Sequence, residues 1–156
     1  MTASPTEGAK APDFSLLVDG GGSISLSGLK GRNVAIYFYP KADTPGCTKE
    51  AMDFSRLKPE FERANTTVIG VSADTVAAQD KFKAKHGLTV PLASDPYRAM
   101  IERYGVWGEK QMYGKKFMGI ERATFLVDGK GTIRKVWHKV KVEGHAEEVL
   151  SAAKAL

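Results

Sequence analysis

The chain has 156 residues, of which 42% are hydrophobic and 26% are charged, and its net charge is +5. This composition is ordinary for a water-soluble globular protein, and the length predicts one domain over residues 1–156. No apolar run reaches the ~20 residues that span a bilayer, so a membrane partner is not expected. The lysines are spread among acidic residues and form no basic stripe, which argues against nucleic acid as a partner.

Cysteine and histidine usage narrows the possible functions. Cys47 is the only cysteine, which excludes an intrachain disulfide, a C-x-x-C redox pair and a cysteine zinc cluster. Three scattered histidines give no metal-ligand spacing, so we expect neither a metal nor a cofactor. Residues 1–8 lack the basic start and apolar middle of a secretory signal. These features together predict a cytoplasmic protein.

The first third of the chain predicts a hairpin followed by a buried strand. Residues 1–12 are expected to be a flexible lead. Short strands are predicted at 14–18 and 23–26, joined by a glycine-rich turn at 19–22. The segment 34–39 is nearly all apolar and aromatic, which indicates a central strand covered on both faces.

A helix is predicted after this strand, because apolar residues recur there at helical spacing, at Ala51, Phe54, Leu57 and Phe61. Pro59 falls inside it, so we expect a kink or a break near Lys58. A second buried strand follows at 67–71. A second helix is expected from about Thr75 to His86, stopped by Gly87.

The remaining elements alternate between strands and helices. A strand is predicted at 88–92, with Pro91 placing it at an edge or an end, and a short helix capped by residues 94–96 runs to about Arg103. Residues 104–119 have no clean period and are expected to be a loop. Strands at 122–127 and 132–138 flank a turn, and a last helix covers about 144–155.

This order of elements predicts an α/β fold. Crossover helices between strands indicate a partly parallel sheet with helices on its faces, and the two hairpins add antiparallel strands. The expected architecture is a central mixed sheet flanked by helices, with an N-terminal β-hairpin.

Cys47 is the residue most suggestive of chemistry. It lies in the first turn of the predicted helix, where backbone N–H groups and the helix dipole favour a thiolate. Asp43 or Thr44 can serve as the N-cap, and Pro45 suits the first turn. The alternative is a small buried hydrophobic residue. The flanking residues 43–50 are mostly polar or turn-forming, which favours a reactive thiol.

Three reaction classes use such a thiol. Disulfide exchange normally requires a second cysteine, which is absent. A cysteine hydrolase requires a histidine base, and none of His86, His138 and His145 lies in a recognisable nucleophile–base context. In the third class the thiolate attacks the O–O bond of a peroxide and becomes a sulfenic acid, which requires donors that hold two adjacent oxygens.

The sequence around the cysteine resembles a known family. Pro40-x-x-x-Thr44-x-x-Cys47 is similar to the active-site signature of the peroxiredoxins, and residues 44–51 resemble the Q-type, or bacterioferritin-comigratory-protein-like, branch. The resemblance extends over nearly the whole chain, through residues 11–14, 71–74, 92–95, 104–107 and 121–128.

The resemblance implies a thioredoxin-like fold and a thiol peroxidase that reduces hydrogen peroxide and organic hydroperoxides. Cys47 matches the peroxidatic cysteine, and Thr44 matches the hydroxyl that bonds the thiolate and the peroxide. Pro40 matches the proline that shields the sulfur from water. Arg122 matches the arginine that steadies the thiolate, and Glu50 matches the residue that orients this arginine.

The chain departs from the Q-type pattern at Met52, where many members carry a resolving cysteine. No other cysteine can take that role, so the sulfenic acid must be reduced by an external thiol, which can be thioredoxin, glutaredoxin or glutathione. The family branch suggests a monomer. Two alternatives remain open, a peroxide-sensing redox relay protein and an inert thioredoxin-like module with a buried thiol.

Overall fold

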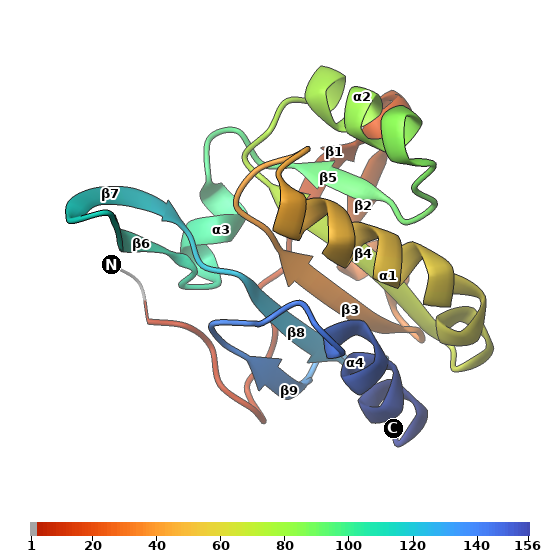
Figure 1. Cartoon of the computed structure of the whole chain (residues 1–156). Coiled ribbons are helices and arrows are strands. Elements are labelled where there is room, and N and C mark those ends of the chain that lie inside the picture. Colours follow the sequence, from red (N-terminus) through yellow and green to blue (C-terminus); the bar gives the residue numbers. More distant parts are fainter. Residues whose placement is uncertain (1–2) are drawn as a thin grey trace.

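The computed structural model describes residues 3–156, which form a seven-stranded sheet with helices packed against it (Figure 1). The strand order is β2-β1-β5-β4-β3-β8-β9. These strands are β1 Ser15–Val18, β2 Ser23–Ser25, β3 Asn33–Phe38, β4 Thr66–Ser72, β5 Leu92–Ser94, β8 Ala123–Val127 and β9 Ile133–Trp137. A separate sheet pairs β6 Trp107–Met112 with β7 Lys115–Ile120. The helices are α1 Pro45–Arg63, α2 Val76–His86, α3 Ala99–Arg103 and α4 His145–Lys154.

The large sheet is mixed, as the order of elements predicts. β3, β4 and β5 are parallel, and α1 and α2 lie in the two connections between them. β1 pairs antiparallel with β2 across the turn Asp19–Gly21, which confirms the N-terminal hairpin. β8 pairs antiparallel with both β3 and β9. The predicted α/β architecture is therefore confirmed.

β3 is at the centre of the core, and its residues from Val34 to Phe38 are buried. Ala35 and Tyr37 pack with apolar side chains of α1 and α4. Val34, Ile36 and Phe38 face the opposite side of the sheet, where they pack with α3 and the N-terminal segment. Two covered faces explain the continuous apolar run in the sequence. No helix within residues 3–156 combines the length and the apolarity needed to cross a membrane.

Of the kink or break expected near Lys58, the break is wrong, because α1 continues through Pro59. A proline has no N–H to donate to the carbonyl four residues earlier, which here belongs to Ser55. Thr89 contacts this residue instead. Its Oγ1 donates to the Ser55 carbonyl at 3.4 Å, and its amide donates to Ser55 Oγ at 3.0 Å. Tertiary packing thus replaces the hydrogen bond that the proline removes.

The prediction of an irregular loop over 104–119 is also wrong. β6 and β7 form a hairpin that projects from the body of the molecule (Figure 1). Its two-residue turn is Tyr113-Gly114, with φ of 52° and 78°. Positive φ at both turn residues suits the twist of a tight hairpin. Most side chains of both strands are exposed or half-buried, so no alternation of apolar and polar residues marks them in the sequence.

The described part of the N-terminal lead is bound to the body, contrary to the expected flexible segment. Lys10 forms a β-bridge with Thr132, and Ala11 is buried. Backbone hydrogen bonds join Gly8 to Ile133 at 2.8 Å and Ala11 to Gly131 at 2.9 Å. Residues 1–2 of the same prediction lie outside the described residues.

Two predicted boundaries after α2 are displaced. β5 begins directly after Pro91 and lies inside the sheet between β1 and β4, so the strand expected at 88–92 starts later than predicted. α3 starts at Ala99 instead of after residue 96, because Arg98 adopts a left-handed backbone conformation with φ of 63°. Asp95 still caps this helix, since its Oδ2 accepts a hydrogen bond from the Ile101 amide at 2.8 Å.

Candidate active site

Cys47 lies where the chain passes from β3 into α1. Thr44 is the N-cap residue with extended backbone dihedrals, and Pro45 opens the helix, as the sequence predicts. Cys47 is the third helical residue and is only 1% exposed. Its backbone N–H is among those at the helix start that have no partner within the helix, so the local field favours a negative charge on the thiol.

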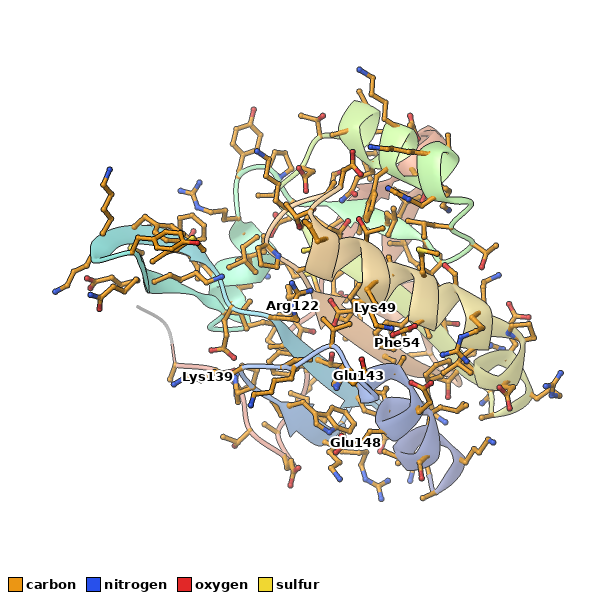
Figure 2. The ribbon with its side chains drawn as sticks, in the orientation of Figure 1. Lys49, Phe54, Arg122, Lys139, Glu143 and Glu148 are labelled. Carbon is orange, nitrogen blue, oxygen red and sulfur yellow. The ribbon has the colours of Figure 1, made fainter. Side chains whose placement is uncertain are left out.

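Arg122 is brought to this cysteine by strand pairing. β8 runs antiparallel to β3, with Ala123 opposite Phe38, so the residue before β8 lies beside the end of β3. The Arg122 guanidinium donates a hydrogen bond from Nη2 to Cys47 Sγ at 3.4 Å, across 75 residues of sequence. Figure 2 shows Arg122 between the first turns of α1 and the base of the β6–β7 hairpin.

Glu50 holds the other arm of the guanidinium. Arg122 Nη1 donates to Glu50 Oε1 at 2.7 Å, and the Glu50 side chain is 1% exposed. Burial raises the pKa of Glu50 to about 7, although the charge of Arg122 acts in the opposite direction. The pKa of Arg122 is raised, because the charges of Glu50 and Cys47 outweigh the opposing effect of burial. The guanidinium therefore stays cationic and bridges the carboxyl of Glu50 and the sulfur of Cys47.

Gly46 is a site residue that the sequence reasoning missed. A Cβ atom at this position would lie 3.1 Å from Arg122 Nη2, closer than most side-chain contacts allow. The missing side chain therefore lets the guanidinium approach the start of α1. The pattern Pro-Gly immediately before the cysteine was the available signal, but it also fits an ordinary helix start.

Thr44 and Pro40 belong to the same loop but make no hydrogen bond to the sulfur among the described contacts. Thr44 Oγ1 donates to the Lys41 carbonyl at 2.8 Å, so its proton is engaged in the loop and its oxygen is left as an acceptor. Pro40 is half-buried at the start of the loop. The structure thus joins Cys47, Arg122 and Glu50 directly and places Thr44 and Pro40 on the loop that leads to them.

A cleft of about 520 Å³ borders Arg122 on the side of the β6–β7 hairpin. Gly108 and Gly119, which are paired across the hairpin, and Lys110 line it. Lys110 Nζ donates to the Ile120 carbonyl at 2.8 Å, and burial lowers the pKa of this lysine. Within residues 3–156, no group of three or more His, Cys, Asp or Glu side chains is arranged to hold a metal ion.

Comparison with known proteins gives a consistent result for sequence and for structure. Residues 8–136 match the model of the AhpC/TSA family. The chain is 50% identical to a putative peroxiredoxin bcp of Coxiella burnetii, over 92% of this chain and 95% of that protein. It is 45% identical to peroxiredoxin Bcp of Bacillus subtilis, over 94% of each.

Two solved structures are similar over almost the whole chain. A cysteine-to-serine mutant of Xylella fastidiosa PrxQ has a TM-score of 0.93 and 40% identity, covering 98% of each chain. Peroxiredoxin Q of Xanthomonas campestris has a TM-score of 0.87 and 47% identity, covering 91% of this chain and 90% of that one. These neighbours confirm the thioredoxin-like fold. The chain therefore belongs to the AhpC/TSA family and, within it, is a peroxiredoxin of the Bcp or Q type that lacks a resolving cysteine.

Proposed function

We propose that this peroxiredoxin, which is a thiol-dependent peroxidase like its family, reduces hydroperoxides at Cys47. The observation that carries the proposal is the 3.4 Å hydrogen bond from Arg122 Nη2 to Cys47 Sγ. A guanidinium at this distance, together with the start of α1, stabilises a thiolate. Glu50 binds the second arm of the guanidinium and holds its orientation.

The peroxide step follows from these groups. The Cys47 thiolate attacks one oxygen of the hydroperoxide, the O–O bond breaks, and the sulfur becomes a sulfenic acid. The other oxygen leaves and takes up a proton, so the second product is water or an alcohol. Arg122 donates to the oxygens as charge develops on them. Thr44 offers its oxygen as an acceptor for the hydroperoxide O–H, and Pro40 shields the sulfur from water.

The second half of the cycle requires a thiol from outside the chain, because Cys47 is the only cysteine. The external thiol attacks the sulfenic sulfur, which releases water and forms a mixed disulfide. A second thiol then attacks this mixed disulfide, which frees the Cys47 thiol and leaves a disulfide between the two external thiols. We propose thioredoxin, glutaredoxin or glutathione as this reductant, acting on a cytoplasmic monomer.

Hydrogen peroxide and organic hydroperoxides are the proposed substrates. The solved structures include one of Xanthomonas campestris bacterioferritin comigratory protein that concerns its alkyl peroxide reduction activity, at 46% identity to this chain. The cleft of about 520 Å³ beside Arg122 offers room for an organic group. The similarity to peroxidases favours this function over the peroxide-sensing relay.

The test compares peroxide consumption by the wild type and Cys47→Ser, with an external thiol present. We expect the variant to lose turnover, because its hydroxyl cannot form a sulfenic acid. Met52→Leu is the control, since Met52 is an exposed side chain on the same helix. After one equivalent of peroxide, intact mass should show a single added oxygen in the wild type and Met52→Leu but not in Cys47→Ser. Equal rates for the wild type and Cys47→Ser would exclude the proposal.

A further inference from the structure

The loop before Cys47 has a second attachment that the peroxide chemistry does not use. Asp43 Oδ2 accepts a hydrogen bond from Lys85 Nζ at 2.8 Å, and Asp43 Oδ1 lies 2.8 Å from His86 Nε2. Lys85 and His86 are the last two residues of α2. Both carboxylate oxygens are thus engaged by one helix end, and we call this three-residue contact the latch.

The latch is attached next to the residue that starts α1. Asp43 directly precedes the N-cap Thr44, and its φ is 63°. Aspartate tolerates this left-handed conformation better than most non-glycine residues, and it turns the chain just before the helix. On the inner side of the same segment Cys47 is 1% exposed. Because Cys47 follows this loop by three residues, displacement of the loop and the first turn of α1 would change the exposure of the sulfur.

A buried Cys47 sulfur favours the peroxide step of the proposed cycle and hinders the later attack by the external thiol. A buried thiolate close to Arg122 is well placed for a small peroxide. The sulfenic acid, in contrast, must be reached by an external thiol, and a sulfur with 1% exposure leaves that thiol no approach. The segment must therefore move between the two steps, and any contact that holds it opposes this movement.

We propose that Asp43 is a positioning residue, which through Lys85 and His86 fixes the 40–44 loop beside the start of α1 and limits access of the external thiol to the Cys47 sulfur. The inference rests on the proposed function for its role in the cycle. The latch itself affects how exposed Cys47 is, and this exposure can be measured without peroxide. Release of the latch is expected to speed attack by thiols on this sulfur and to slow the peroxide step.

The charges around the latch favour the contact. His86 and Lys85 hold the pKa of Asp43 below its usual range, so Asp43 stays anionic at neutral pH. Lys49 and Asp53 of α1 line the same groove as His86, and the His86 ring packs edge-on against Phe82. Lys85 supplies the cation of the latch, and the His86 ring adds a second contact, to the other carboxylate oxygen of Asp43.

The experiment measures the rate at which iodoacetamide labels Cys47 in the reduced protein at one fixed pH, as the ratio of variant to wild type. For Asp43→Asn the ratio should rise about fivefold. For His86→Gln it should rise by a smaller factor, because Lys85 still binds Asp43. Asp43→Glu keeps the carboxylate and should restore a ratio near one. Lys81→Gln, an exposed residue of the same helix, should give a ratio of one.

The outcomes separate this inference from the proposed function. Labelling ratios of one for both Asp43→Asn and His86→Gln would overturn the latch, even if Cys47→Ser loses all peroxidase activity. Raised ratios support it even if peroxide turnover fails. A merely unfolded variant is recognised by lost far-UV circular dichroism, and Asp43→Glu then decides, because only the latch predicts that a retained carboxylate restores slow labelling.

Discussion

Two ionic contacts hold the start of α1 from opposite sides, and they differ in burial. On the inner side, Arg122 joins Glu50 and Cys47, with side-chain exposures of 17% for Arg122 and 1% for Glu50. On the outer side, Asp43 joins Lys85 and His86, and the exposures of Asp43 and Lys85 are 43% and 62%. The distances are similar, at 2.7 Å and 2.8 Å.

The two contacts differ in their exposure to water, and this difference determines the role of each. Water and salt screen the outer contact, so it is weak and easily broken and remade. The inner contact carries the cost of burying charge, and removing one partner strands the other in the core. The inner contact is therefore suited to fixed chemistry at the sulfur, while the outer one is suited to controlling movement of the loop.

The largest effect is expected from breaking the inner contact with Arg122→Ala. The second-order rate with peroxide should fall by about 100-fold, because a donor at the reacting oxygens is lost. The free energy of unfolding should drop by about 3 kcal/mol, since Glu50 is left buried without its cation. Stopped-flow kinetics and urea unfolding measure the two quantities.

Arg122→Lys is the matched control for this change. It keeps a positive charge but lacks the two parallel N–H groups that reach Glu50 and Cys47 together. Stability should recover more than the peroxide rate does. Full activity in Arg122→Ala would contradict the role assigned to the inner contact.

A smaller effect, visible mainly as a pH dependence, is expected from Glu50→Gln. The pKa of Glu50 is raised to about 7 in the folded protein, so the carboxyl favours folding when protonated. That contribution is present below the unfolded pKa near about 4.5 and is lost as pH rises through about 7. The free energy of unfolding of the variant should therefore rise relative to wild type between about pH 5 and pH 8. Chemical denaturation of both proteins at both pH values measures this difference in the free energy of unfolding. The same change with pH in both proteins would show that burial does not raise the pKa of this carboxyl.

The smallest effect is expected from Gly46→Ala, which disturbs the inner contact without removing a charge. The added Cβ would lie 3.1 Å from Arg122 Nη2 and displace the guanidinium slightly. The peroxide rate should fall by about tenfold, because the donor is misplaced. Thermal unfolding should be unchanged or higher, because alanine favours a helix over glycine. Gly22→Ala, where the nearest neighbour is 3.8 Å away, is the control, and a rate equal to wild type in Gly46→Ala would show that the guanidinium has room to spare.

Much of the fold could be predicted from the sequence because its elements carry local signals. The apolar run of β3, the start of α2 near Thr75 and its stop at Gly87 were all found where expected. The failures share a different cause. Pro59 is tolerated because Thr89 reaches Ser55 from a distant segment. The β6–β7 hairpin was missed because its side chains are solvated on both faces and leave no periodic pattern.

The candidate site likewise has features that the sequence predicted and contacts that it did not. The motif residues identified the cysteine and its loop, and Arg122 and Glu50 were found through the family resemblance. In the sequence His86 has no recognisable nucleophile–base context, whereas the structure pairs it with Asp43. Thr44 was expected to bond the sulfur, but its proton goes to the Lys41 carbonyl. Neither contact has a signature in sequence spacing, because each depends on how a loop folds back.

The sequence by itself determined that a lone thiol would stand at the start of a helix and that any reductant must come from outside the chain. Both statements need only residue identity and local backbone preference. Tertiary structure decided how that thiol is held. Antiparallel pairing of β8 with β3 brings Arg122 across 75 residues to the sulfur, and the end of α2 reaches the loop from the other side. Such contacts depend on strand register and burial, which no short stretch of sequence encodes.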